Sequence, residues 1–219
     1  MTLRTVILAN GELPDPEATR ARLAEWQGAH VIAADGGCCH AQVLGLRVDD
    51  VVGDGDSLEP TERKKLRKAG ARLHLVSPEK DETDLELALL MAVQEGPREI
   101  RILGALGGRL DMAMANILLL TLPALAGLDV RIWHGRQTAW LIRPPGDAVV
   151  GAPGDTLSLI PLGGDVRGVR SEGLVFPLND ETLVFGPARG VSNVLVGSRA
   201  ILRFEEGLLL AVHTPGRAE

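Results

Sequence analysis

The first part of the chain alternates short apolar runs with segments whose apolar positions recur at the spacing of a helix. The apolar runs predict six strands, at residues 5–9, 31–34, 51–52, 73–76, 100–103 and 130–133. The segments between them predict helices at residues 16–26, 60–69, 84–94 and 111–120. Such alternation is typical of a mostly parallel sheet with helices on both faces. The pattern therefore predicts an N-terminal α/β domain.

After about Gln137 the pattern changes to short apolar runs with no helix-period segment of useful length. The runs are separated by turn-forming residues at 144–146, 151–154, 163–165, 179–180, 186–187 and 205–207. Turn signals at this spacing favour a small all-β domain, an antiparallel sandwich or barrel. We therefore expect two domains, residues 1–137 and 138–219.

One stretch, Met112–Leu128, is apolar enough to require a test against a membrane span. Asn116 and Pro123 interrupt it, Asp111 and Asp129 flank it, and it is shorter than the ~20 apolar residues that a span needs. We expect a buried helix here and no membrane association. The N-terminal residues do not have the pattern of a signal peptide.

Composition and charge exclude some partners. The 23 lysines and arginines are outnumbered by 29 aspartates and glutamates, which gives a net charge of −6 and argues against a nucleic-acid surface. Aromatic residues make up only 3%, so base-stacking platforms are not expected. The two cysteines, Cys38 and Cys39, are adjacent and lack the spacing of a zinc site. A reducing, cytoplasmic setting is expected.

Carboxylates follow four successive predicted strands, usually beside glycine. The segments are Asp35-Gly36-Gly37, Gly53-Asp54-Gly55-Asp56-Ser57, Lys80-Asp81-Glu82-Thr83-Asp84 and Gly104-Ala105-Leu106-Gly107-Gly108-Arg109-Leu110-Asp111. In an open α/β sheet, ligands bind beyond the carboxyl ends of the strands. We therefore expect these segments to meet at one edge of the sheet.

Asp54 and Asp56 are two residues apart, so in an extended segment they point the same way and can share one cation. Carboxylates together with water suit Mg²⁺ that bridges to substrate phosphates. Gly53 and Gly55 would let a phosphate approach the backbone. An ordinary Asp/Gly surface turn explains the same residues, and both interpretations stay open.

Asp84 and the glycine-rich turn also have structural explanations. Thr83 and Glu86 form a capping box, in which Asp84 would favour the helix dipole. In the turn at 104–111, free backbone N–H groups and Arg109 could bind phosphate, or the glycines could serve only to pack a helix on the sheet. The turn lacks the Gly-Lys-Ser/Thr of a Walker A loop.

Together the four segments describe a nucleotide triphosphate site that works by charge neutralisation and positioning. In this order, they resemble the thiamine pyrophosphokinase family. The second half is similar to that family's thiamine-binding domain at Gly173-Leu174-Val175-Phe176-Pro177-Leu178 and Gly190-Val191-Ser192-Asn193. The resemblance implies that the hydroxyl of thiamine attacks the β-phosphorus of ATP, giving AMP and thiamine diphosphate.

The resemblance also implies roles for individual residues. The catalytic set would be Asp54, Asp56, Asp84 and Asp111, the first three holding Mg²⁺; the ATP site would comprise Asp35, Gly36, Gly37, Lys80, Gly107, Arg109 and Asp111; thiamine would be bound by Phe176, Gly190, Ser192 and Asn193. Either Asp84 or Asp111 would orient the attacking hydroxyl. The family resemblance further implies a homodimer with thiamine at the subunit interface.

The chain departs from the family pattern at three positions. Gly55 stands where an aromatic residue is usual, Met112 where histidine is common, and Phe176 where tyrosine or tryptophan is more usual. Two other functions remain as alternatives: a pyrophosphokinase acting on another hydroxymethyl heterocycle, such as a pterin, and a non-catalytic module that senses a nucleotide or thiamine. Intact carboxylates argue against the sensor, and the motifs around Phe176 and Asn193 favour thiamine.

Overall fold

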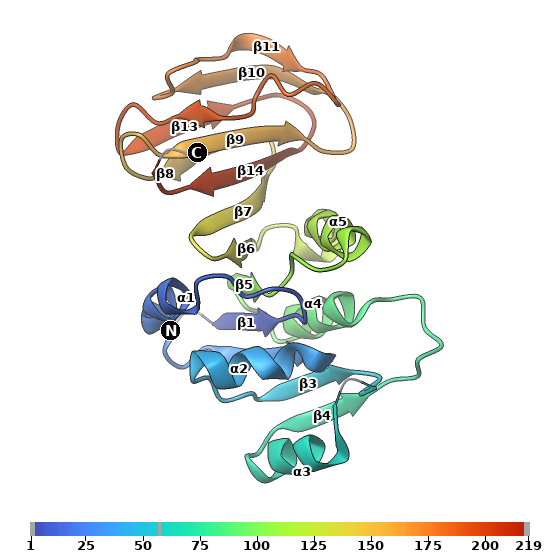
Figure 1. Cartoon of the computed structure of the whole chain (residues 1–219). Helices are drawn as coiled ribbons and strands as arrows, with labels where there is room; N and C mark the ends of the chain where they lie inside the picture. The colour runs from blue at the N-terminus through green and yellow to red at the C-terminus, as the bar shows by residue number, and fades with distance from the viewer. Residues whose placement is uncertain (1–2, 57, 217–219) are drawn as a thin grey trace. The chain divides into compact units, whose positions relative to one another are not determined.

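The computed structural model describes residues 3–56 and 58–216, and its contacts divide the chain into two compact units, Met1–Gly135 and Arg136–Glu219 (Figure 1). Ser57, part of the Asp54/Asp56 motif, lies outside the described residues. No helix among those described is long and apolar enough to cross a membrane.

The first unit is an α/β fold with six parallel strands in the order β6-β5-β1-β2-β3-β4. The strands are β1 (Arg4–Leu8), β2 (His30–Ala34), β3 (Asp50–Gly53), β4 (Arg72–Leu75), β5 (Glu99–Leu103) and β6 (Asp129–His134). The chain moves outward from β1 to β4 and then returns to β5 on the other side of β1. The strand order therefore reverses between β1 and β5, which is where such sheets bind ligands.

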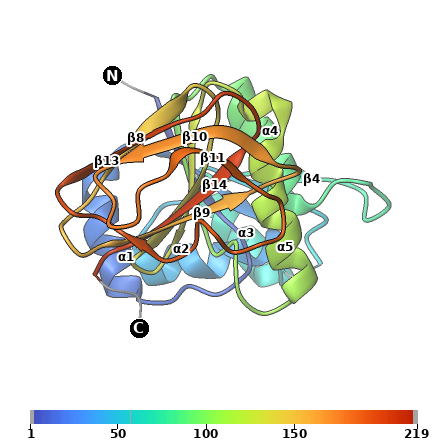
Figure 2. The same ribbon diagram turned by 90° about the horizontal axis from the view of Figure 1, so that it is seen from above.

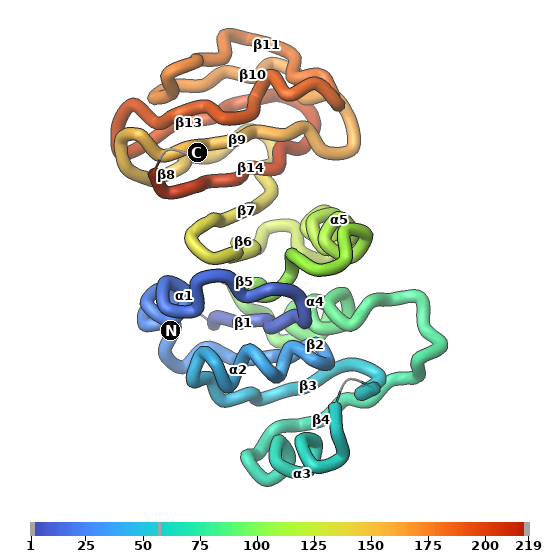
Figure 3. The backbone as a smooth tube through the Cα atoms, viewed as in Figure 1, coloured from blue at the N-terminus to red at the C-terminus, as the bar shows by residue number. Residues whose placement is uncertain are grey.

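Five helices connect these strands: α1 (Pro16–Leu23), α2 (Cys38–Leu44), α3 (Pro60–Lys68), α4 (Asp84–Gln94) and α5 (Leu110–Leu118). Helices α1 and α2 pack together on one face of the sheet, whereas α4 packs on the opposite face against β1, β2 and β3 (Figures 1 and 2). The segment between β4 and α4 extends away from the sheet (Figure 3). The α/β prediction is confirmed for this unit, although the short helix α2 was not predicted.

The second unit is a sandwich of two antiparallel sheets, in the orders β12-β9-β14-β7 and β11-β10-β13-β8. Its strands are β7 (Gln137–Ile142), β8 (Gly146–Val150), β9 (Thr156–Pro161), β10 (Val166–Glu172), β11 (Asn179–Leu183), β12 (Asn193–Val194), β13 (Arg199–Arg203) and β14 (Leu209–Thr214). Residues from both sheets, including Trp140, Leu159, Val169 and Leu202, form one buried core. The prediction of an antiparallel all-β domain is confirmed.

The expectation of a buried helix after Asp111 is wrong. Helix α5 ends at Leu118, and Leu110, Met114 and Leu118 are 78%, 52% and 48% exposed. These residues are four positions apart and so share one face of the helix, which we call the α5 stripe. The apolar residues of the stripe therefore form an exposed surface of α5 and do not belong to the core.

Asp50 lies at the start of β3 and is almost fully buried, with an exposed fraction of 1%. It accepts hydrogen bonds from Arg72 (2.8 Å, Nε), His30 (2.6 Å) and His74 (2.6 Å). Burial alone would raise the pKa of Asp50, but the hydrogen bonds from Arg72, His74 and His30 outweigh burial and hold that pKa below its ordinary value. The cluster ties the first residues of β2, β3 and β4 together.

We expect Asp50→Asn to lower the free energy of unfolding by about 3 kcal/mol near neutral pH, because a buried amide replaces the carboxylate that accepts hydrogen bonds from Arg72, His30 and His74. A carboxyl whose folded pKa is lowered stabilises the fold fully above its unfolded pKa of about 3.9, and that stabilisation is lost as pH falls through the folded pKa. The difference between wild type and variant in urea unfolding should therefore shrink below about pH 4.

Asp49→Asn is the matched control, since Asp49 carries the same charge next to Asp50 but is only partly buried and bonds Arg47 and the Val31 N–H. A loss of stability from Asp49→Asn as large as that from Asp50→Asn would contradict the special role of the Asp50 cluster.

Candidate functional site

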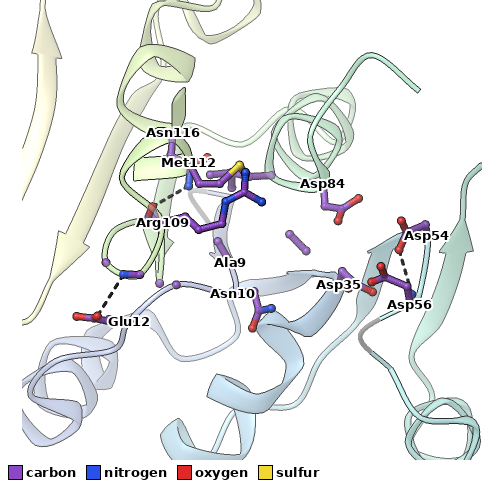
Figure 4. Close-up of a pocket in the computed structure, with 17 residues that line it drawn as sticks. Ala9, Asn10, Glu12, Asp35, Asp54, Asp56, Asp84, Arg109, Met112 and Asn116 are labelled. Carbon is purple, nitrogen blue, oxygen red and sulfur yellow. Dashed lines mark hydrogen bonds between the residues drawn. The ribbon is translucent and has the colours of Figure 1, made fainter. Parts of the chain in front are cut away.

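A pocket of about 550 Å³ opens at the carboxyl ends of the parallel strands, where the strand order reverses (Figure 4). Segments following β1, β2, β3 and β5 line it, together with the first turns of α4 and α5. The lining residues are Ala9, Asn10, Gly11, Glu12, Ala34, Asp35, Asp54, Asp56, Asp84, Leu85, Gly104, Ala105, Gly107, Gly108, Arg109, Met112 and Asn116. The structure thus brings the four predicted segments to one pocket.

Three carboxylates converge in this pocket. Asp35, Asp54 and Asp84 each offer an oxygen, and these oxygens lie within 4.8 Å of one another. Asp35 is 5% exposed, adopts a positive φ of 40°, and its Oδ1 has no hydrogen-bond partner among the described residues. A buried carboxylate oxygen without a partner, next to two further carboxylates, fits a bound divalent cation.

Asp35 joins this cluster in a way that the sequence did not reveal. The sequence placed Asp35 in the ATP site and named Asp56 as the third metal ligand. Gly53 explains the close approach of β2 and β3, since a Cβ added there would lie 2.8 Å from the Cβ of Asp35. A glycine at this position lets Asp35 and Asp54 come together.

Asp56 is exposed and lies at the rim of the same pocket. Its backbone N–H donates to Asp54 Oδ1 at 3.0 Å, so the segment is a turn and not the extended pair expected from the sequence. The motif therefore forms a local turn, and Asp54 lies near Asp35 and Asp84. That Asp54 and Asp56 share a cation stays a prediction.

Asp84 lies both at a helix start and near the Asp54 segment. Helix α4 begins at Asp84, and Thr83 caps it by accepting a hydrogen bond from the Glu86 N–H at 3.2 Å. Because Thr83 provides the cap, the Asp84 carboxylate remains available to the cluster. Lys80 forms an ion pair with Asp84 and holds that carboxylate from the side of the preceding loop.

The glycine-rich turn after β5 is paired with the segment that follows β1. Gly11 donates to the Gly104 carbonyl, and Glu12 donates to that of Leu106, both at 2.7 Å. The Glu12 side chain lies against Gly107, where a Cβ would come within 2.5 Å of it, and Glu12 accepts a hydrogen bond from the Gly108 N–H at 3.2 Å. The Glu12 carboxylate therefore accepts a hydrogen bond from one of the backbone N–H groups that the sequence analysis expected to be free for phosphate.

Glu12 and Asn10 line the pocket but were missed in the sequence. The signal was present, because the pair Asn10-Gly11 marks a turn directly after a predicted strand. That strand end carries no aspartate-glycine motif, so the sequence pattern does not mark it as part of the site.

Arg109 and Asp111 form an exposed bidentate pair, with distances of 3.1 and 2.6 Å. The hydrogen bond from Arg109 lowers the pKa of Asp111, and the same bond raises the pKa of Arg109. Arg109 lines the pocket, whereas Asp111, Lys80, Gly36 and Gly37 do not. Asp111 is thus placed to hold Arg109. Gly37 has a packing role, since a Cβ added there would lie 2.0 Å from the Leu8 carbonyl oxygen.

The predicted thiamine-binding residues lie close together in the second unit, but their side chains differ in exposure. Phe176 is 58% exposed, whereas Asn193 is buried. Asn193 holds the Phe176 backbone from both sides: its Oδ1 accepts from the Phe176 N–H at 3.0 Å, and its Nδ2 donates to the Phe176 carbonyl at 2.6 Å. Asn193 therefore positions the segment that presents the ring.

Gly190 and Ser192 hold the neighbouring segment against β9. A Cβ on Gly190 would lie 2.3 Å from the Leu159 carbonyl, and the Ser192 N–H donates to Ser158 Oγ at 3.1 Å. Ser192 adopts a positive φ of 59°. These backbone contacts fix the segment that leads to Asn193, and Asn193 in turn bonds the backbone of Phe176.

The fold and the pocket define a two-unit protein: an α/β unit with a carboxylate-lined pocket at its strand ends, and a β-sandwich unit. The family model of the thiamin pyrophosphokinase catalytic domain matches residues 22–132, and that of the thiamin pyrophosphokinase vitamin B1 binding domain matches residues 143–209. The chain belongs to the thiamine pyrophosphokinase family, which makes thiamine diphosphate.

Individual relatives agree with this assignment. Thiamine pyrophosphokinase of Bacillus subtilis (strain 168) is 31% identical over 185 residues, which cover 84% of this chain and 86% of the relative. The crystal structure of the Bacillus subtilis enzyme superimposes with a TM-score of 0.84 at 28% identity, covering 97% of this chain and 99% of that one. Thiamin pyrophosphokinase from Geobacillus thermodenitrificans gives a TM-score of 0.82 at 27% identity, covering 97% of each chain.

Proposed function

We propose that this chain transfers the diphosphoryl group of ATP to the hydroxyl of thiamine, giving thiamine diphosphate and AMP. The convergence of Asp35, Asp54 and Asp84 at the switch point of the sheet carries this proposal, in a chain of this family. The hydroxyl oxygen loses its proton and bonds to the β-phosphorus, the bond from that phosphorus to the α–β bridging oxygen breaks, and AMP leaves with that oxygen.

The carboxylate cluster fits Mg²⁺, since its ligands are oxygens and the Asp35 Oδ1 lacks a partner among the described residues. We propose that Asp35 joins Asp54 and Asp84 in holding the ion, with Asp56 at the rim as the further ligand expected from the sequence. Bound Mg²⁺ neutralises phosphate charge and polarises the β-phosphoryl group. Lys80 holds Asp84 toward the cluster.

Arg109 is the pocket cation suited to bind phosphate oxygens, and Asp111 orients it. Asp84 lies among the converging carboxylates, whereas Asp111 is 65% exposed and paired with Arg109. Of the two candidates for orienting the attacking hydroxyl, we therefore favour Asp84. Phe176 supplies the ring that stacks on thiamine, and Asn193, Ser192 and Gly190 hold its loop.

The assay that tests the function mixes the purified chain with ATP, Mg²⁺ and thiamine and separates the products. Equal amounts of AMP and thiamine diphosphate are expected. Formation of ADP and thiamine monophosphate would indicate a simple kinase, and turnover of a pterin alcohol in preference to thiamine would indicate the related pyrophosphokinase. Binding without any product would favour a sensor. The cytoplasmic setting and the absence of nucleic-acid binding remain predictions.

We also propose that the enzyme is a homodimer, because it exposes apolar surfaces that a second copy would cover. The α5 stripe is one, and the second unit also exposes the apolar side chains of Val175, Phe176, Val191 and Val196. Thiamine bound at Phe176 would then lie at or near the subunit interface.

Replacing Met114 at the centre of the α5 stripe with glutamate should weaken the dimer by about tenfold or more, because the charge would be buried at the contact. Light scattering over a dilution series measures this. The exposed residue Val43 on α2, 48% exposed, gives the control Val43→Glu, which should leave the mass unchanged. A Met114→Glu chain with the dimerisation constant of the wild type would place the interface elsewhere.

A further inference from the structure

Asn116 is a buried polar side chain of the nucleotide pocket. It lies on α5 one turn after Met112, is 6% exposed, and lines the pocket (Figure 4). Its Nδ2 donates to the Ala105 carbonyl at 2.7 Å. This hydrogen bond fixes the orientation of the carboxamide, because a flipped group would set its oxygen against the carbonyl oxygen of Ala105.

The other end of the same carboxamide is unsatisfied. Asn116 Oδ1 is buried and has no hydrogen-bond partner in the described part of the chain. Leaving a buried acceptor unpaired costs free energy comparable to a lost hydrogen bond. A donor group on the ligand that enters the pocket would remove this cost.

The other residues that line the pocket indicate which donor this is. The apolar lining residues are Ala9, Ala34, Leu85, Ala105 and Met112. The carboxylate cluster and Arg109 provide the charged groups that Mg²⁺ and phosphates need. Apolar side chains together with an unpaired amide oxygen suit a planar base that carries an amino group.

We propose that Asn116 Oδ1 accepts a hydrogen bond from the 6-amino group of adenine and thereby makes the enzyme specific for adenine over guanine nucleotides. This inference rests on the proposed use of ATP. Guanine carries a carbonyl oxygen at the 6 position, so two acceptors would face each other, and the bond to Ala105 prevents the amide from turning round.

The test compares ATP with purine riboside 5′-triphosphate, which differs only in lacking the 6-amino group, in the wild type and in Asn116→Leu. We expect the wild type to favour ATP by about tenfold or more in kcat/KM, because the analogue leaves the acceptor unpaired. Asn116→Leu should lower kcat/KM for ATP by a similar factor and change that for the analogue little. A purely structural role for Asn116 would lower both values equally and keep their ratio.

Met112→Leu is the control, since it changes the apolar wall without touching the acceptor and should preserve the ratio between the two nucleotides. If Asn116→Leu fails to fold, Asn116→Ser provides the smaller change for the same comparison. An unchanged ratio in the folded variant, or equal use of both nucleotides by the wild type, overturns the proposal. If the wild type instead discriminates against 2′- or 3′-deoxy-ATP and Asn116→Leu loses that discrimination, the acceptor binds a ribose hydroxyl. That result would also overturn the proposal.

Calorimetry with the same nucleotides and Mg²⁺ separates this inference from the proposed function. If the wild type makes no thiamine diphosphate but binds ATP more tightly than the analogue through Asn116, the function is wrong and the base contact stands. If it makes thiamine diphosphate equally well from both nucleotides, the function stands and the base contact is wrong.

Discussion

Asp54→Asn is expected to reduce the formation of thiamine diphosphate by about 10³-fold or more while leaving the fold intact. Asp54 is the central carboxylate of the sequence motif and one of three whose oxygens lie within 4.8 Å of one another. An amide at this position removes a negative charge from the proposed site for Mg²⁺ and the phosphates of ATP. Steady-state kinetics with ATP and thiamine, over a range of Mg²⁺ concentrations, would measure the loss.

Asp54→Asn should lower the activity but raise the stability of the metal-free protein. This combination distinguishes a metal ligand from a residue that the fold requires. Like charges about 4–5 Å apart repel by about 1 kcal/mol in a water-like medium, so without metal the variant should melt about 2–4 °C higher than the wild type. Mg²⁺ should raise the melting temperature of the wild type but have little effect on that of Asp54→Asn. Thermal unfolding in EDTA and in Mg²⁺ tests both points.

Asp81→Asn is the matched control, because Asp81 is exposed and carries the same charge three residues before Asp84. It should keep both the activity and the Mg²⁺-dependent stabilisation. Near-wild-type activity in Asp54→Asn would contradict the metal assignment. A large fall in its melting temperature in EDTA would mean that Asp54 is a structural residue.

The sequence predicted the part of the site that topology determines. Parallel strands place their carboxyl ends at one edge, so the motifs around Asp54, Asp84 and Arg109 had to meet there once the strands were recognised. It did not predict that Asp35 joins Asp54 and Asp84, because this depends on a positive φ at Asp35 and on the close approach allowed by Gly53. Local spacing carries no information about either.

The remaining misses have a similar cause. In the sequence, Asn116 only interrupts an apolar stretch, whereas in the structure one end of its amide is bound to Ala105 and the other end has no partner among the described residues. The α5 stripe was expected to be buried because apolar residues at helical spacing look the same in a core and on an exposed face. In both cases the deciding information was which groups surround the side chain.

Phe176→Ala should raise the KM for thiamine by roughly 30-fold and leave the KM for ATP within about twofold, since stacking and burial of an aromatic ring together contribute about 2 kcal/mol. The ring is 58% exposed and its backbone is held on both sides by Asn193, so it is presented on a fixed loop. Removing the ring therefore leaves the loop in place. Initial rates with each substrate varied in turn separate the two constants.

Phe185→Ala provides the control, because Phe185 is the other strongly exposed phenylalanine of the second unit, at 57%, and lies outside the two motifs assigned to thiamine. Phe176→Trp restores a stacking face and should recover most of the affinity lost in Phe176→Ala. No such recovery is expected if Phe176→Ala acts by disturbing the fold. Equal effects of Phe176→Ala and Phe185→Ala on thiamine, or an equal rise in both KM values for Phe176→Ala, would remove Phe176 from the thiamine site. The substrate would then have to bind through groups other than this ring.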